Sequence, residues 1–166
     1  MTICIWVNAR DWSDIKNGDY IVGDFNNLSN EVRFGKKLLA SPGPTGSGIR
    51  FGSEFASFSI ASEGKWVSVR TTPSTPYKIG LWYHLTGIYD GDNLKIYVNG
   101  QLEGQEPHKG TINFKFVESQ LGGIFGQRRP GFDGTLDEVA IYRRALTDDE
   151  IDTIYRMGVL GKHFVK

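Results

Sequence analysis

The sequence contains a single cysteine, Cys4, among its 166 residues. One cysteine excludes an intrachain disulfide, so redox chemistry does not fix the compartment. Cys4 lies in an apolar run, which favours a buried, inert thiol over a nucleophile. The chain also lacks a run of about 18 consecutive apolar residues, so we expect no membrane insertion. Residues 1–8 have neither the basic leader nor the small-residue cleavage site of a signal peptide.

An excess of charge of either sign is also missing, because 19 Lys and Arg residues balance 19 Asp and Glu residues. Such a chain has no overall field to attract nucleic acid or an anionic membrane, and we expect neither partner. No shift in composition divides the sequence, so residues 1–166 are expected to form a single domain. The 21 glycines and 13% aromatic residues suit short strands joined by tight turns, which favours an all-β fold.

The hydrophobic pattern predicts a series of strands and one helix. Residues 2–8 form a continuous apolar run typical of a strand covered on both faces, so the chain starts in the middle of a sheet. The Asn99-Gly100 pair predicts a hairpin turn. Residues 147–150 (TDDE) form a capping box, which predicts a helix from about Asp148 to Arg156 that ends at Gly158. Alternation and turn signals predict the other strands at residues 20–25, 32–34, 49–51, 56–60, 66–70, 82–90, 94–98, 101–103 and 120–125.

These elements together predict a two-sheet antiparallel β-sandwich with one short C-terminal helix. The alternation along residues 66–70 indicates on which face of the sheet one tryptophan lies. If the two valines of residues 66–70 face the core, Trp66 stands on the opposite face with Ser68 and Arg70. Tryptophan beside hydrogen-bonding side chains suits the apolar face of a sugar ring, or stacking with an arginine. The alternative is that a loop or the other sheet covers Trp66.

One acid also has an informative phase. Residues 132–147 read as a turn, a last strand and the start of the helix. Counting by two along this strand places Asp137 on the same side as Val139 and Ile141. A carboxylate at the rim of a buried face needs a cation, an arginine or backbone N–H groups to stay charged. We therefore expect Asp137 to turn inward and to meet a positive partner.

Several of these segments resemble the laminin-G-like, concanavalin A-like lectin/glucanase superfamily. They are residues 82–91 (WYHLTGIYDG), 94–100 (LKIYVNG), 134–139 (GTLDEV), 142–146 (YRRAL) and the early strand at 2–8. The resemblance implies a jelly-roll, concanavalin A-like sandwich in which Trp6 and Trp82 fill the interior, and it favours an extracellular or cell-surface location. Lectins, adhesion modules, carbohydrate binders and glycosidases share this fold, so the resemblance does not select one function.

The resemblance also implies a structural calcium ion, held between an Asp of the last strand and backbone carbonyls of an early loop. On this chain the ligands would be Asp137, Gly23 and Asp24. Carboxylate and carbonyl oxygens are suitable ligands for calcium. The alternative for Asp137 is a salt bridge or a backbone cap.

Members of the superfamily carry a strand before the segment that residues 2–8 resemble. Three explanations for its absence stay open: the sequence begins inside the domain, the tail at residues 159–165 (VLGKHFV) takes its place, or a second subunit does. In the last case the open sheet edge would drive formation of a homo-oligomer.

The glycosidases of the superfamily carry a Glu-x-Asp-x-x-Glu motif on one strand. The nearest match, residues 150–155 (EIDTIY), lies on the predicted helix and ends in Tyr155. We therefore expect no enzyme. His84, His108 and His163 have no metal-ligand spacing, and His84 reads as a hydrogen-bonded structural residue.

The favoured function is a non-catalytic, lectin-like module that binds a carbohydrate with Trp66, Arg70 and Trp12. Arg128 and Arg129 would clamp an acidic or sulfated sugar, the alternative being a solvated loop. The second hypothesis is a protein-interaction module that self-associates through an open sheet edge. The third is a glycoside hydrolase of an unrecognised type.

Overall fold

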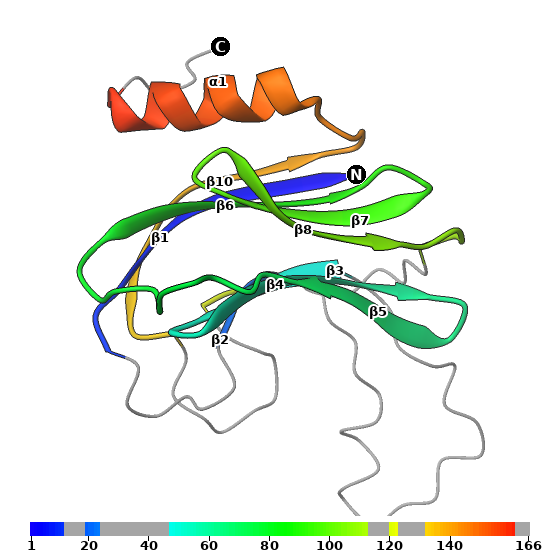
Figure 1. The fold of residues 1–166 in the computed structure, drawn as a ribbon, viewed down its shortest axis with the longest axis horizontal. Helices are drawn as coiled ribbons and strands as arrows, with labels where there is room; N and C mark the ends of the chain where they lie inside the picture. The colour runs from blue at the N-terminus through cyan, green and yellow to red at the C-terminus, as the bar shows by residue number, and fades with distance from the viewer. Residues whose placement is uncertain (12–18, 24–46, 113–119, 123–131, 162–166) are drawn as a thin grey trace, which may run out of the picture.

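The computed structural model describes residues 1–11, 19–23, 47–112, 120–122 and 132–161. Two five-stranded antiparallel sheets lie face to face, and a helix lies on the outer side of the first sheet (Figure 1). The predicted two-sheet β-sandwich with one C-terminal helix is therefore confirmed. The predicted strand at residues 32–34 lies outside the described residues.

The first sheet has the strand order β10-β1-β6-β7-β8, so β1 lies between two neighbours, as expected of a chain that starts in the middle of its sheet. Its strands are β10 (Gly134–Tyr142), β1 (Thr2–Ala9), β6 (Trp82–Tyr89), β7 (Asn93–Val98) and β8 (Gln101–Pro107). The second sheet has the order β5-β4-β3-β2-β9. Its strands are β5 (Lys65–Arg70), β4 (Phe55–Ser62), β3 (Ser47–Gly52), β2 (Asp19–Gly23) and β9 (Gln120–Leu121).

Strand β1 separates two hydrophobic layers. Ile3, Ile5 and Val7 are buried in the cluster between the two sheets, at 2%, 0% and 0% exposure. Cys4, on the opposite face of the strand, is buried in a second cluster with Ile151 of the helix. Burial of each of these aliphatic side chains stabilises the folded state by about 1.5–3 kcal/mol. Strand β1 is apolar throughout because its two faces pack into two different clusters.

Helix α1 (Asp148–Val159) begins at the predicted capping box but runs past its predicted end. Gly158 does not terminate the helix. It lies against the indole of Trp6, where a Cβ would come within 2.6 Å of ring atoms. The left-handed conformation that ends helices occurs three residues later, at Gly161 (φ 64°). No helix in the described part of the chain is long and apolar enough to cross a membrane.

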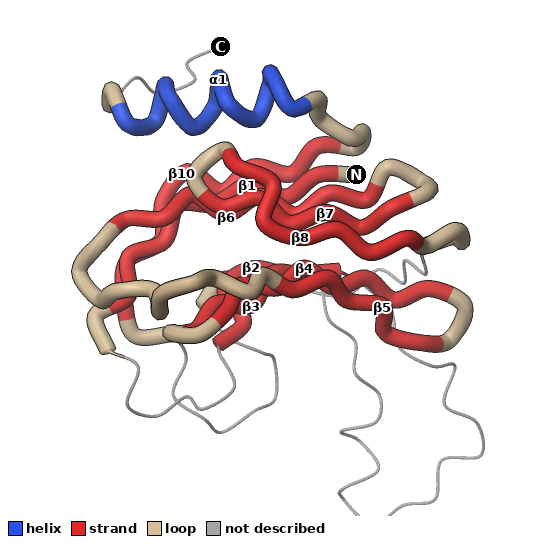
Figure 2. The backbone as a smooth tube through the Cα atoms, viewed as in Figure 1, coloured by secondary structure: helices blue, strands red, loops and turns tan. Residues whose placement is uncertain are grey.

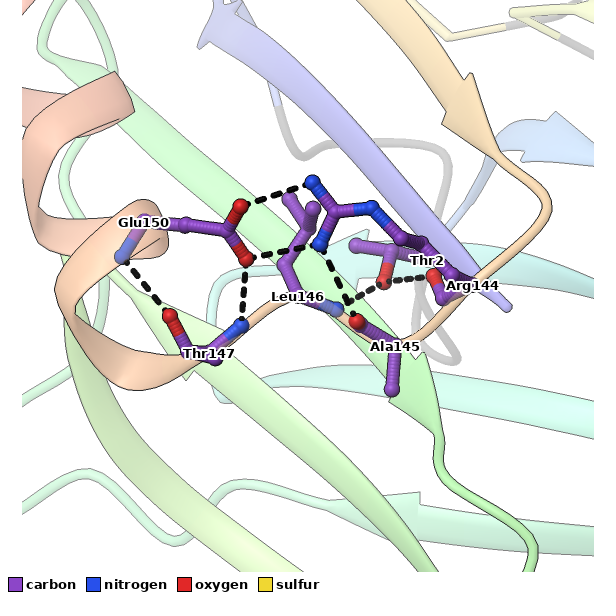
Figure 3. Close-up of polar contacts among 6 residues, drawn as sticks. All are labelled: Thr2, Arg144, Ala145, Leu146, Thr147 and Glu150. Carbon is purple, nitrogen blue, oxygen red and sulfur yellow. Dashed lines mark hydrogen bonds and ion pairs between the residues drawn. The ribbon is translucent and has the colours of Figure 1, made fainter.

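A network of hydrogen bonds fixes the start of α1 to β1 (Figure 3). The buried Thr2 hydroxyl donates to the carbonyl of Arg144 at 2.9 Å and accepts the N–H of Leu146 at 3.0 Å. The Arg144 guanidinium binds both carboxylate oxygens of Glu150 at 2.8 and 2.7 Å. This arginine, helped by the backbone N–H of Thr147, lowers the pKa of Glu150 to about 2. The capping carboxylate therefore stays charged.

The expectation that Trp6 and Trp82 fill the sandwich interior is wrong. Side chains alternate between the two faces of a strand. The inward face of β1 and β6 carries odd-numbered residues such as the fully buried Ile5 and Leu85, so the even-numbered Trp6 and Trp82 lie on the other face. Trp6 lies half-buried on the helix side, stacked on Tyr155 with ring centroids 5.8 Å apart. Trp82 is 42% exposed.

Candidate functional site

The outer side of the second sheet collects the polar and aromatic side chains that the core excludes. Because Ala56, Phe58 and Ile60 of β4 point into the core, the alternate residues of β4 and their cross-strand partners point outward. No described helix or strand covers this side, whereas α1 covers the first sheet (Figure 2). We call this surface the β3–β5 outer face. Its outward side chains are Arg50, Phe55, Ser57, Ser59, Ala61, Trp66, Ser68 and Arg70.

One end of the β3–β5 outer face contains stacked arginines. The Cζ atom of Arg70 lies 3.7 Å from the ring centroid of Phe55, and that of Arg50 lies 5.8 Å from it. Phe55 is only 7% exposed, and the two guanidinium groups pack against its ring. Cation–π contact of this kind orients a guanidinium without neutralising its charge.

The middle and the other end of this face carry hydroxyl groups and the indole. Ser59 and Ser68 share a hydrogen bond of 2.8 Å between their hydroxyls, either of which can donate. Trp66 is half-buried and lies opposite Ala61. Arg70 lies four positions after Trp66 along β5, a distance of about 13 Å. An apolar aromatic face, hydroxyls and a guanidinium therefore follow one another along one strand.

The structure brings Trp66, Ser68 and Arg70 to one face, as the strand phase predicts. Arg50 and Phe55 complete the stacked end, and the sequence analysis did not place Phe55 there. Trp12, Arg128 and Arg129 lie outside the described residues, and their part in this site stays a prediction.

The expectation that Asp137 turns inward is wrong. The register of β1 and β10 shifts between Cys4 and Trp6, and Glu138 takes a left-handed conformation (φ 47°), which is a β-bulge. The bulge changes the strand phase: Ile141 lies opposite the core residue Ile3, whereas Asp137 lies opposite Trp6 on the helix side. Asp137 is exposed and accepts the N–H of Glu138 at 2.8 Å. The backbone-cap alternative is the arrangement found.

Two of the calcium ligands implied by the resemblance lie on different sheets. Gly23 ends β2 in the second sheet, between Gly48 and Gln120, whereas Asp137 faces away from that sheet. Asp24 lies outside the described residues. Among the described residues, no group of three His, Cys, Asp or Glu side chains could hold a metal ion. A calcium ion at Asp137, Gly23 and Asp24 therefore stays a prediction, and the exposed, backbone-capping position of Asp137 does not by itself support it.

Beneath the helix lies a histidine whose environment the sequence did not reveal. His84 is 1% exposed, with its ring centroid 5.1 Å from that of Trp6 and 6.3 Å from that of Tyr155. Burial lowers the pKa of His84 to about 4. Its backbone N–H donates to Asn99 at 2.9 Å, but its Nδ1 atom has no hydrogen-bond partner in the described ranges. His84 is thus structural, neutral at pH 7 and only partly hydrogen-bonded.

The sequence match to the glycosidase motif lies on the helix, as expected. Its two carboxylates are engaged in ion pairs: Glu150 with Arg144, and Asp152 with Arg156 at 2.7 Å. They hold the helix start and a helix turn, and they are not arranged as an acid–base pair on a sheet face.

Comparison with known proteins agrees with this fold. Residues 1–152 match the family model described as the concanavalin A-like lectin/glucanases superfamily. Human adhesion G-protein coupled receptor D1 is 34% identical over 97 residues, which cover 55% of this chain and 10% of the receptor. The chain thus matches only a small part of that relative.

Solved structures with lower sequence identity share the fold. The receptor binding domain of botulinum neurotoxin D superposes with a TM-score of 0.66 at 14% identity, covering 96% of this chain and 37% of that one. The binding domain of botulinum neurotoxin serotype G gives 0.65 at 18% identity, covering 95% and 36%. A candidate carbohydrate-binding protein from Bacteroides ovatus gives 0.62 at 19% identity, covering 91% and 39%.

The family model covers most of the chain, and the chain folds into two antiparallel sheets. The protein belongs to the concanavalin A-like lectin/glucanase superfamily.

Proposed function

We propose that this protein is a non-catalytic carbohydrate-binding module whose ligand lies on the β3–β5 outer face. One observation carries the proposal: Trp66, the Ser59–Ser68 hydroxyl pair and Arg70 lie on one side of a sheet that no described helix or strand covers. The fold shared with receptor-binding and carbohydrate-binding proteins supports a binding role.

Each group on this face has a clear role toward a sugar. The indole of Trp66 offers an apolar surface to the C–H side of a sugar ring. The Ser59 and Ser68 hydroxyls can both donate and accept, which suits the hydroxyl groups of a carbohydrate. The paired β-strands hold these side chains in place before binding, so little conformational entropy is lost on association.

The same face argues against hydrolysis. Glycosidases need two carboxyl groups beside the scissile bond, roughly 5–10 Å apart. The outward side chains of the described strands β3, β4 and β5 include no Asp or Glu. A sugar on this face therefore meets an aromatic ring, hydroxyls and guanidinium groups, but no acid–base pair.

Affinity electrophoresis in gels containing soluble polysaccharides tests the proposal. The wild-type protein should be retarded by at least one polysaccharide, and Trp66→Ala should abolish the retardation. Trp82→Ala is the matched control, because Trp82 is 42% exposed but lies on the other sheet. Equal retardation of Trp66→Ala, or no retardation of the wild type in any glycan, would contradict the proposal.

A second candidate function is self-association through β10. Among the described strands, this one forms an edge of the first sheet, and its Val139 and Ile141 side chains are 37% and 57% exposed. An open apolar edge is a template for strand pairing, although the bulge at Glu138 interrupts it. Light scattering should then report a dimer that Ile141→Lys converts to a monomer. A monomeric wild-type protein removes this candidate.

A further inference from the structure

The β3–β5 outer face carries a charge that the chain as a whole does not. Basic and acidic residues balance at 19 each over the full sequence. Among the outward side chains of the described strands β3, β4 and β5, however, Arg50 and Arg70 are the charged ones, and both are positive. The outward side chains of these three strands therefore attract an anion.

Arg70 is held in place yet not neutralised. Its guanidinium lies over Phe55 at 3.7 Å and forms no hydrogen bond or ion pair in the described part of the chain. By contrast, Arg10, Arg144 and Arg156 each pair with a carboxylate. A guanidinium has five N–H donors in a planar fork that matches carboxylate and sulfate oxygens. Arg70 thus presents these donors in an orientation that stacking has already fixed.

Arg50 adds a second positive group from a neighbouring strand. The sheet register places Arg50 and Arg70 on either side of Ser57, and both guanidinium groups lie over Phe55. Adjacent strands are about 4.8 Å apart, so the two arginine backbones are roughly 10 Å apart. An oxyanion above Phe55 would be attracted by both groups.

We infer that Arg70 selects oligosaccharides that carry an anionic group, either a carboxylate or a sulfate. This inference rests on the proposed carbohydrate-binding function and assigns different parts of the ligand to Arg70 and Trp66. The anionic group binds at Arg70, and an uncharged part of the ligand stacks on Trp66. Because these residues are about 13 Å apart along β5, a ligand that reaches both is longer than one sugar ring.

Two pairs of glycans that differ only in charge test the inference by calorimetric titration. The first pair is oligogalacturonate and its methyl ester, which lacks the carboxylate charge. The second pair is dextran sulfate and dextran, which isolates the sulfate. The protein should bind the charged member more tightly than the neutral member in one pair or in both. The pair that shows this difference in affinity identifies the anionic group.

Arg70→Gln removes the charge while keeping a polar side chain. It should weaken binding of the charged glycan by about tenfold to a hundredfold, the usual range for a hydrogen bond to a charged group, and leave the neutral partner unchanged. Arg70→Lys keeps the charge but loses the planar fork, and it should bind with intermediate affinity. Arg143→Gln is the control, because Arg143 is also exposed but lies in the connection between β10 and α1.

The outcomes separate this inference from the proposed function. Binding that depends on Trp66 but ignores both glycan charge and Arg70→Gln overturns the inference and leaves the function standing. Equal losses for Arg70→Gln and Arg143→Gln also overturn it, since that result reflects only net charge. Absence of binding to all four glycans and to the wider polysaccharide panel overturns both.

Discussion

Gly158 of the helix lies directly against the indole of Trp6 on the first sheet. A Cβ at position 158 would come within 2.6 Å of Trp6 ring atoms. Glycine inside a helix costs about 1 kcal/mol relative to alanine, so the sequence accepts a local cost here. In return the helix approaches the sheet closely enough for Tyr155 to stack on the same indole.

Gly158→Ala should therefore destabilise the protein by about 1–3 kcal/mol, because overpacking at Trp6 outweighs the gain in helix propensity. Urea unfolding measures the change. Thr153→Ala, at an exposed position on the same helix, should stay within about 0.5 kcal/mol of the wild type. A more stable Gly158→Ala variant would show that this close contact does not limit helix docking.

His84 should make stability depend on pH. Its pKa is about 4 in the folded protein and about 6.5 in an unfolded chain. Above pH 6.5 the ring is neutral in both states. As the pH falls from 6.5 to 4, the unfolded chain binds a proton that the folded protein does not, so about 3 kcal/mol of stability is lost over this window.

Urea unfolding between pH 7.5 and 4.5 measures this loss. His84→Phe keeps an aromatic ring beneath the helix but cannot titrate, so its stability should fall less steeply than that of the wild type. Parallel curves for the two proteins would mean that His84 is accessible to protons in the folded state.

The Thr2 hydroxyl should be important for stability although it lies far from the proposed site. Thr2→Val leaves the N–H of Leu146 without its acceptor and the carbonyl of Arg144 without its donor, at a cost of about 1–3 kcal/mol. Thr86→Val is the control: Thr86 is equally buried, but its hydroxyl contacts only the Cys4 sulfur, at 3.5 Å. Chemical denaturation should show a larger loss of stability for Thr2→Val than for Thr86→Val. Equal losses would contradict a stabilising role for the hydrogen bonds of Thr2 to Arg144 and Leu146.

Calcium should not stabilise this protein through Asp137. The carboxylate already caps the bulge at Glu138, and it lies opposite Trp6 on the helix side of the first sheet. Melting temperatures in excess calcium and in a chelator should agree, for the wild type and for Asp137→Asn alike. A rise of several degrees with calcium that Asp137→Asn removes would require a different position for this side chain.

Strand phase could be predicted from the sequence wherever a strand is regular. In β5 the alternation of two valines with Trp66, Ser68 and Arg70 gave the correct face. In β10 the same counting failed, because the bulge at Glu138 adds one residue and inverts the phase. A left-handed glutamate has no sequence signal comparable to glycine, so the inversion was not visible.

Contacts between distant elements were also beyond the sequence. The stacking of Arg50 and Arg70 on Phe55 depends on the register of three strands, which turn geometry and core packing set together. The burial of His84 depends on where α1 docks, and that follows from Gly158 and Trp6. The outward position of Trp66 thus follows from strand alternation, whereas the ring of Phe55 that orients Arg70 follows only from the packing of three strands.

Carbohydrate binding at Trp66 is tested most directly by following the tryptophan indole N–H signals by NMR while a glycan that retards the protein is added. The Trp66 signal should shift with ligand concentration, whereas the signals of Trp6 and Trp82 should stay in place. Saturable shifts confined to Trp6 or Trp82, with Trp66 unchanged, would place the ligand on the other sheet and exclude binding at the β3–β5 outer face.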